Sequence, residues 1–240
     1  CDISENALWQ PYWTPLFSRS ADGGKTWSDP EPVCPSRGRI YDAVYQDGEI
    51  RVLHFANDAT VDWTGTTDEH LYELYVSNDE GKTFMKRSTL PMMTKHRGYG
   101  SLGRLENGGL IAYVYNRTNE YVLDYVISAD GGRTWSGVNT SRFSRKIRNP
   151  QFIAFDGKFY MHGRSGAYGE GKGNLILYMS LDGVTWDNGV YLRTLEAGAG
   201  AYSNSIVVGS KNAQIQNRLL IQASHAYEDN KTNVLHWWLD

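Results

Sequence analysis

The fold of this chain is decided by the stretch Ser128-Ala129-Asp130-Gly131-Gly132-Arg133-Thr134-Trp135. The short Asp side chain accepts hydrogen bonds from backbone N–H groups, and Gly adopts the positive φ that a chain reversal needs. Thr then re-enters a strand, and the closing Trp offers a large apolar face to a neighbouring sheet. The stretch therefore predicts a tight turn that is locked between two strands.

Copies of this stretch recur along the chain. They lie at residues 20–27, 77–84 and 180–186, the last being one residue shorter and the second ending in Phe84. The Asp residues of the four copies are separated by 57, 51 and 52 residues. A near-constant period is typical of a repeat architecture. We expect the turns to be scaffold rather than site.

The segments between these turns predict a repeated set of strands joined by Asp-Gly or Asn-Gly reversals. Three complete sets are expected, at residues 40–45, 50–55 and 71–76, then 102–105, 110–115 and 122–127, then 151–155, 159–162 and 175–179. With the strand that follows each turn, every set becomes a four-stranded antiparallel meander. Such a small sheet cannot bury both faces alone, so the sheets are expected to stack around an axis as β-propeller blades.

The number of blades follows from counting these strands. The chain supplies the last two strands of one blade, three complete blades and a final set at residues 202–208, 219–223 and 234–239. We therefore predict an all-β propeller of four-stranded antiparallel blades, with about five blades represented.

The composition agrees with a soluble all-β domain. Aromatic residues make up 13% of the 240 residues and there are 25 glycines, as many short strands and tight turns require. The formal net charge of −3 leaves no basic excess for nucleic acid. No apolar stretch reaches the roughly 18 residues of a membrane span. We expect no nucleic-acid partner and no membrane span.

The sequence indicates neither a metal nor a cofactor. The six His residues are scattered, and the only cysteines are Cys1 and Cys34, so no metal-ligand spacing is present. These two cysteines either form a disulfide or remain a free terminal thiol and a small buried residue. The chain begins without Met and with strand-like sequence, which suggests a fragment or a processed chain.

The four turns and their spacing resemble the Asp-box, or BNR, repeats of the sialidase (neuraminidase) superfamily, whose catalytic domains are six-bladed propellers. The resemblance covers nearly the whole chain, so residues 1–240 look like a single domain that lacks its N-terminal blade and part of the second. It implies an exo-α-sialidase-like glycoside hydrolase that releases sialic acid or a related acidic sugar from glycans. A secreted, cell-surface or periplasmic location follows from the same resemblance.

The chemistry of that family tells which residues to seek. Three arginines clamp the substrate carboxylate, since guanidinium groups stay charged and offer paired donors. The nucleophile is a neutral Tyr, because a carboxylate would be repelled by the substrate, and a nearby Glu draws its proton. The first of the arginines and the acid/base Asp belong to the family's first blade and cannot be assigned here.

The final blade supplies two matches. Tyr202, in Gly200-Ala201-Tyr202-Ser203, is similar to the Ala-Tyr-Ser segment that opens the last blade of sialidases, which makes it the candidate nucleophile. Glu228, which follows Tyr227, resembles the Glu that orients the first arginine in that family. The alternatives are an ordinary strand Tyr and an exposed loop Glu.

Candidates for the carboxylate clamp come from two other blades. Arg117, at the end of a strand, matches the position of the second arginine. The third position holds Lys172, a departure that keeps the charge but loses the paired donors, so either Lys172 or the nearby Arg164 serves there. Surface charges of a loop or strand end are the alternative for all three.

The main mismatch lies where sialidases place the Glu that activates the Tyr. Here stands Tyr99, within a segment that contains no carboxylate, although His96 in the same segment could act as a base near neutral pH. Tyr99 and His96 are therefore candidate substrate-binding residues. The mismatch leaves two alternatives open: a non-catalytic propeller that binds acidic glycans, and a polysaccharide lyase or another glycosidase on the same scaffold.

Overall fold

The computed structural model of the chain describes residues 12–58, 64–67, 69–165, 174–194, 202–209, 217–228 and 231–240, with the backbone alone at 225–228 and 231–232. These residues form strands, turns and irregular segments. No helix among them is long and apolar enough to cross a membrane.

Five antiparallel sheets follow one another along the chain. The first has two strands, β1 (Leu16–Phe17) and β2 (Glu31–Pro32). The second contains β3 (Gly38–Gln46), β4 (Glu49–Ala56), β5 (Leu71–Ser77) and β6 (Met85–Thr89). The third contains β7 (Arg97–Arg104), β8 (Leu110–Asn116), β9 (Val122–Ser128) and β10 (Asn139–Arg142).

The fourth sheet contains β11 (Arg148–Phe155), β12 (Lys158–Ser165), β13 (Asn174–Ser180) and β14 (Val190–Arg193). The last has three strands, β15 (Ser203–Val208), β16 (Arg218–Glu228) and β17 (Lys231–Leu239). Each four-stranded sheet is a meander in sequence order. The predicted series of two strands, three complete blades and a final set is confirmed.

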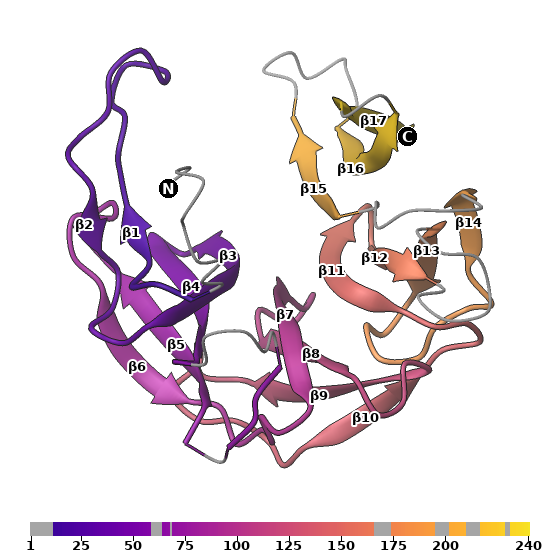
Figure 1. The fold of residues 1–240 in the computed structure, drawn as a ribbon, viewed down its shortest axis with the longest axis horizontal. Coiled ribbons are helices and arrows are strands. Elements are labelled where there is room, and N and C mark those ends of the chain that lie inside the picture. The colour runs from indigo at the N-terminus through magenta and orange to yellow at the C-terminus, as the bar shows by residue number, and fades with distance from the viewer. Residues whose placement is uncertain are drawn as a thin grey trace.

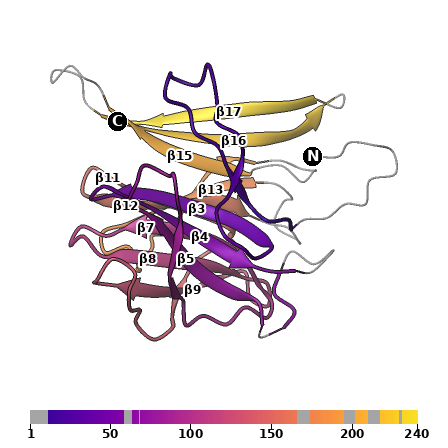
Figure 2. The same cartoon turned by 90° about the vertical axis from the view of Figure 1, so that its left-hand side faces the viewer.

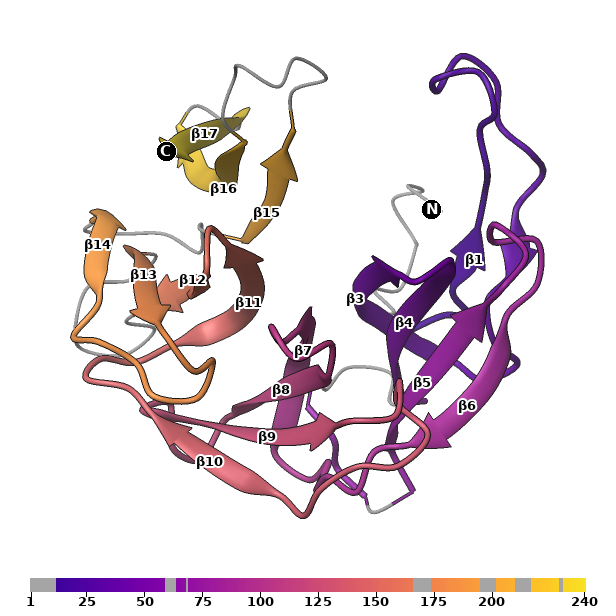
Figure 3. The same cartoon turned by 180° about the vertical axis from the view of Figure 1, so that it is seen from behind.

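The sheets are arranged around an axis as the blades of a β-propeller, along an open arc (Figure 1). The first strand of each blade, β3, β7, β11 and β15, lies on the concave side, and the last strand lies outside (Figures 1 and 3). Neighbouring inner strands pack on one another, β7 against both β3 and β11, and β11 against β15. Seen from the side, β15–β17 form a layer next to the preceding blades (Figure 2). Residues at the start of these inner strands therefore meet on the concave side.

The Asp-centred turns contain the predicted hydrogen bonds. In the second turn, Asp79 Oδ1 accepts the Thr83 N–H at 2.9 Å and Asp79 Oδ2 accepts the Thr83 hydroxyl at 2.6 Å. These bonds, and one from the Ser77 hydroxyl, hold the pKa of Asp79 well below its usual range. In the third turn Gly132 has a φ of 84°, and a Cβ there would lie 2.1 Å from Leu74 of the preceding blade. Gly is required at that position by both conformation and space.

The closing aromatic residue of three turns packs against the preceding blade or its connection. Phe84 contacts Phe17 of β1, with ring centroids 5.1 Å apart, and Trp135 Nε1 donates to Ser88 Oγ of β6 at 3.0 Å. Trp186 stacks on Phe143, which follows β10. The same prediction is wrong for the first turn.

Trp27, which closes that first turn, is 64% exposed. Its indole N–H donates to Gly24 O within its own turn, at 3.1 Å. The apolar face of the Trp27 ring therefore lies largely in solvent.

The second blade buries the described cysteine. Cys34 is a free thiol, 3% exposed, and burial raises its pKa to about 11. Its Sγ lies 3.5 Å from His54 Nε2, and His54 Nδ1 lies 3.2 Å from Glu73 Oε2. The prediction of a small buried residue is confirmed for Cys34, and Cys1 lies outside the described residues. The thiol stays protonated near neutral pH, so this group is structural.

Candidate functional site

Two arginines face each other on adjacent strands of the fourth blade. Arg148 opens β11 and pairs directly with Arg164 of β12. The two side chains are therefore cross-strand neighbours, where like charges repel. Burial and the nearby Arg148 charge lower the pKa of Arg164, which is 7% exposed. Because a guanidinium stays charged despite such a shift, an anion placed between the two would relieve the repulsion.

The register that creates this pair depends on a bulge. From Gln151↔His162 to Phe155↔Lys158 the hairpin is regular, and extending it would place Asn149 opposite Arg164. A shift between Arg148 and Gln151 brings Arg148 there instead. A β-bulge re-aims the side chains beside it, and it accounts for the paired arginines.

Tyr202 joins this pair from the last blade. It precedes β15, and the guanidinium carbon of Arg164 lies 5.3 Å from the centroid of its ring. The Tyr202 phenol also interacts with Tyr99 of β7. Burial, followed by the nearby Tyr202, raises the pKa of Tyr99, which is 8% exposed. The Tyr99 phenol is thus neutral near pH 7.

Tyr99 has a strained backbone. Its φ is +29°, and the register between β7 and β8 shifts between Gly98 and Gly100. A bulky residue at positive φ is uncommon and is held in place by its surroundings. Its ring is packed against Tyr41 at 5.7 Å and Tyr115 at 6.0 Å, which fixes the phenol toward Tyr202.

One carboxylate of the described residues lies beside this cluster. Glu120 accepts a short hydrogen bond from the Tyr115 hydroxyl. Burial, followed by that hydrogen bond, raises the pKa of Tyr115. The Arg148 guanidinium carbon lies 5.8 Å from the Tyr115 ring and 5.9 Å from the Tyr99 ring. Arg148 therefore lies between Tyr115, which is hydrogen-bonded to Glu120, and Tyr99, which interacts with Tyr202.

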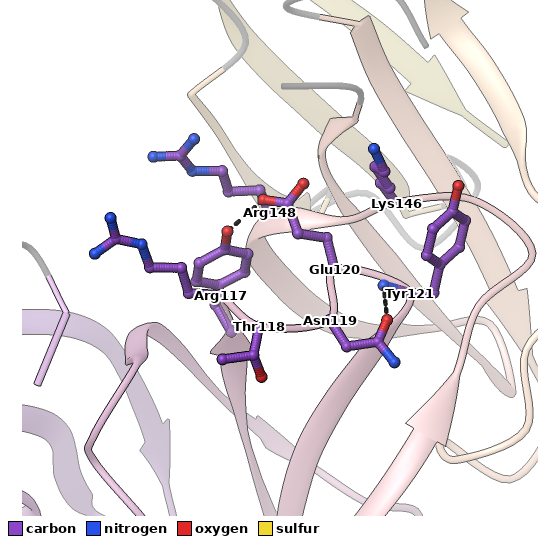
Figure 4. Close-up of a pocket in the computed structure, with 8 residues that line it drawn as sticks. Arg117, Thr118, Asn119, Glu120, Tyr121, Lys146 and Arg148 are labelled. Carbon is purple, nitrogen blue, oxygen red and sulfur yellow. Dashed lines mark hydrogen bonds between the residues drawn. The ribbon is translucent and has the colours of Figure 1, made fainter. Parts of the chain in front are cut away.

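Arg117 is oriented by a turn at the end of β8. The buried Asn116 side chain accepts hydrogen bonds from the backbone N–H groups of Thr118 and Asn119, at 3.0 and 3.1 Å. The turn presents Arg117 to a pocket of about 550 Å³ that it shares with Arg148 and Glu120. In Figure 4, Arg117 and Arg148 extend in the same direction, with Glu120 beside them. The described part of the site therefore gathers three arginines, two phenols and one Tyr–Glu pair.

Comparison with known proteins assigns the family. The model of the BNR repeat-like domain matches residues 17–189. The chain belongs to the BNR repeat-like domain family. No curated protein matches the sequence of this BNR repeat-like propeller.

Solved structures share the fold at low sequence identity. A protein of unknown function from Dyadobacter fermentans is 17% identical, with a TM-score of 0.68 over 96% of this chain and 67% of its own. The K499G mutant of NanB sialidase from Streptococcus pneumoniae is 15% identical, with a TM-score of 0.64 over 92% of this chain. The BNR repeat-like propeller spans 34% of that sialidase chain.

A further similar structure has another activity. The α-L-arabinanase of Penicillium chrysogenum, complexed with arabinobiose, is 14% identical, with a TM-score of 0.52 over 83% of this chain and 61% of its own. Similarity at these identities shows the sialidase-like propeller fold and leaves the reaction to be argued from the site.

The sequence-predicted residues are placed unequally in the BNR repeat-like propeller. Tyr202, Arg164 and Tyr99 are brought together, and Arg117 lies on the same side through the shared pocket. Lys172 lies outside the described residues. Glu228 ends β16, where its backbone pairs with Lys231, and its side chain is outside the described part.

His96 is placed by its backbone. It is exposed, has a φ of +57°, and its carbonyl oxygen accepts the Arg117 N–H at 3.0 Å. Its N–H donates to Gly65 O at 2.8 Å. The His96 backbone therefore stabilises the start of the turn that carries Arg117.

Two residues of the site were not predicted from the sequence. Arg148 is opposite Arg164 only because of the bulge, and the hairpin turn alone would have predicted Asn149 there. Glu120 reaches Tyr115 through a loop whose conformation the sequence pattern did not predict. Among the described residues, no group of three or more His, Cys, Asp or Glu side chains could hold a metal ion.

Proposed function

We propose that this site binds the carboxylate of a terminal acidic sugar, such as sialic acid, and that the protein is an exo-acting glycoside hydrolase. The observation that carries the proposal is the opposed pair Arg148 and Arg164, with Tyr202 against the second of them. Two like charges on neighbouring strands, a buried Arg164 and a partly buried Arg148, favour an anion, and paired guanidinium donors match a carboxylate. Arg117 supplies the third cation from the neighbouring pocket.

The reaction assigned to Tyr202 is nucleophilic substitution at the anomeric carbon. Its phenol oxygen forms the bond to that carbon while the bond to the leaving oxygen breaks, and the phenol proton ends on the leaving oxygen. Water then attacks the anomeric carbon, the bond to the Tyr202 oxygen breaks, and a proton of that water returns to this oxygen as the sugar is released. A neutral phenol suits a substrate with a carboxylate beside the reacting carbon, because a carboxylate nucleophile would be repelled. Glu228 and Lys172 remain proposed as members of the site, Glu228 as a supporting carboxylate and Lys172 as a further cation.

A second candidate function is binding of acidic glycans without turnover. The observation that favours it is the partner of Tyr202, which is Tyr99 rather than a carboxylate. Since burial raises the pKa of Tyr99, this phenol is a poor base near neutral pH. Tyr99 would then shape the pocket instead of activating Tyr202.

Hydrolysis of an aryl α-sialoside by the full-length protein separates these functions. We expect turnover, a loss of at least roughly 100-fold in kcat in Tyr202→Phe, and unchanged turnover in the control Tyr45→Phe, whose ring is 76% exposed. Binding of sialic acid without turnover would favour the second function. Release of an unsaturated sugar would indicate a lyase, and absence of both binding and turnover would refute the proposal.

A further inference from the structure

The connection between β10 and β11 is unusually basic. Residues 142–148 contain four cations, which are Arg142, Arg145, Lys146 and Arg148. Only Arg148 belongs to the proposed carboxylate clamp. The net charge of the protein is −3, so a cluster of cations in one connection is not explained by a general excess of positive charge.

Three of these cations lie over Tyr rings. Arg145 lies 4.6 Å from the Tyr191 centroid, Lys146 lies 5.9 Å from the Tyr121 centroid, and Arg148 covers the Tyr115 ring. A cation near the face of an aromatic ring is attracted by the negative electrostatic potential of that face. These contacts therefore hold the three cations in place along the connection.

Lys146 and Tyr121 extend the pocket that contains Arg117 and Arg148. All four line the same cavity of about 550 Å³. Figure 4 shows Lys146 and Tyr121 on one side of Glu120, and Arg117 and Arg148 on the other. This second side offers a cation beside a ring that is 37% exposed at Tyr121, the combination that an acidic sugar can use through its carboxylate and its apolar face.

The two walls of this pocket are fixed to each other. The Ile147 N–H donates to Glu120 O at 2.9 Å, and the Phe143 N–H donates to Tyr121 O at 2.9 Å. Ile147 and Phe143 are themselves buried in the core of the third and fourth blades. Lys146 is therefore carried by a segment that is anchored on both sides and is preorganised for binding.

Arg145 lines a second pocket. That pocket is lined by Ser144, Arg145, Asn188 and Tyr191. The Tyr178 hydroxyl holds both backbone polar groups of Arg145. It accepts a hydrogen bond from the Arg145 N–H at 3.1 Å and donates one to the Arg145 carbonyl oxygen at 2.9 Å. Three residues of chain span at most about 10 Å, so Arg145 and Arg148 are within reach of one short oligosaccharide.

We infer that the 142–148 connection is an extended subsite for a polyanionic glycan, in which the sugars beyond the terminal one also carry carboxylate or sulfate groups. The inference rests on the proposed function for its first sugar, which the arginine pair holds. The next acidic sugar lies in the cavity beside Lys146 and Tyr121, and the following one reaches Arg145 and Tyr191. The substrate class is therefore an acidic homopolymer or repeat rather than a neutral glycan with a single acidic cap.

Calorimetric titration with three probes tests the subsite. The probes are sialic acid, its α2,8-linked tetramer, and the neutral tetramer of N-acetylglucosamine. All titrations use the Tyr202→Phe background, which the proposed function expects not to cleave the tetramer. In this background the protein should bind the acidic tetramer roughly tenfold more tightly than the monomer, and the gain should shrink at high salt. The double variant Arg145→Gln, Lys146→Gln should lose this gain and keep its affinity for the monomer.

Matched controls are available on the Asp-centred turns. Arg133 and Lys82 are exposed cations at the opposite end of the strands, so Arg133→Gln with Lys82→Gln removes the same charge from another place. This control should retain the gain, and melting temperatures verify that both double variants fold.

Three outcomes would overturn the inference. They are monomer binding without a gain for the acidic tetramer, a gain that survives in Arg145→Gln, Lys146→Gln, and an equal gain with a short inorganic polyphosphate. Failure of the monomer itself to bind would instead refute the proposed carboxylate clamp. The two proposals therefore fail in distinguishable ways.

Discussion

Arg148 and Arg164 are the side chains on which the proposed clamp depends most. Each presents a planar set of donors, and their positions opposite one another allow one carboxylate to be bound from both sides. Lys at either position would keep the charge and lose the paired geometry. An Arg-to-Lys substitution therefore separates the contribution of the charge to binding from the contribution of the guanidinium geometry.

We expect Arg164→Lys to weaken the binding of sialic acid by roughly tenfold or more, because hydrogen bonds to charged groups are lost while the net charge is retained. Calorimetric titration measures the effect. Arg133→Lys, on an exposed turn, serves as the control and should bind as the unaltered protein does. Equal affinity in Arg164→Lys would show that the guanidinium geometry does not matter.

Asp42 provides a pH-dependent contribution to stability. Its Oδ2 accepts the Ser101 hydroxyl at 2.7 Å and the Leu102 N–H at 2.9 Å, and Ser101 Oγ accepts the Phe152 N–H at 2.8 Å. The group thus ties the inner strands of three blades together. Burial raises the pKa of Asp42 to about 6, against the lowering by these hydrogen bonds.

The sign of the effect follows from that raised pKa. Between about pH 4 and pH 6 the unfolded chain releases the Asp42 proton while the folded protein retains it, so this group's contribution to stability is lost as pH rises. We expect the titration of Asp42 to lower the free energy of unfolding of the unaltered protein by about 2 kcal/mol, and we expect no such contribution in Asp42→Asn. Urea unfolding at pH 4.5 and pH 7 measures the difference, and parallel pH profiles for the two proteins would contradict it.

Among the strands and turns, the closing aromatic residues make the blades depend on one another. The Trp186 ring stacks on Phe143 at 5.7 Å and meets Phe152 edge-on at 6.1 Å, whereas Trp27 occupies the same place in its turn and is 64% exposed. The two residues are therefore a matched pair in the same motif with different burial.

We expect Trp186→Ala to lower the free energy of unfolding by about 2 kcal/mol or more, because it removes a large ring from a packed interface. Trp27→Ala should change it by less than about 0.5 kcal/mol in this chain. Urea unfolding of the two variants makes the comparison. Similar losses for both would mean that the turn itself, rather than packing on the preceding blade, carries the stability.

The strands and turns were largely predictable from the sequence, because the Asp-centred turns fix where each blade ends and the Asp-Gly and Asn-Gly reversals fix the hairpins. β4, β5, β8 and β9 begin and end within one residue of their predicted bounds. β7 begins at Arg97, five residues before its predicted start at Leu102, because its pairing with β8 continues on both sides of the bulge between Gly98 and Gly100.

The site was less predictable than the scaffold, because β-bulges and loop conformations decide which side chains reach it. Bulges shift the register by one residue and decide which side chain faces the concave side, and alternation of apolar residues does not reveal them. Tyr202 and Arg164 could be proposed because they lie near strand ends whose position the repeats define. Arg148 and Glu120 could not, since one depends on a bulge and the other on a loop.

For the protein as a whole, the propeller brings side chains from three blades to one place. Arg117 and Tyr99 come from the third blade, Arg148 and Arg164 from the fourth, and Tyr202 from the last. Residues more than 100 positions apart in sequence meet because the inner strands stack around an axis. The central claim is that this meeting point is a binding site for an acidic sugar.

A crystal structure of the protein soaked with sialic acid tests that claim most directly. We expect the sugar carboxylate within hydrogen-bond distance of Arg148 and Arg164, with Arg117 nearby and the anomeric carbon facing the Tyr202 hydroxyl. A sugar bound elsewhere, or one whose carboxylate points away from both arginines, would contradict the account.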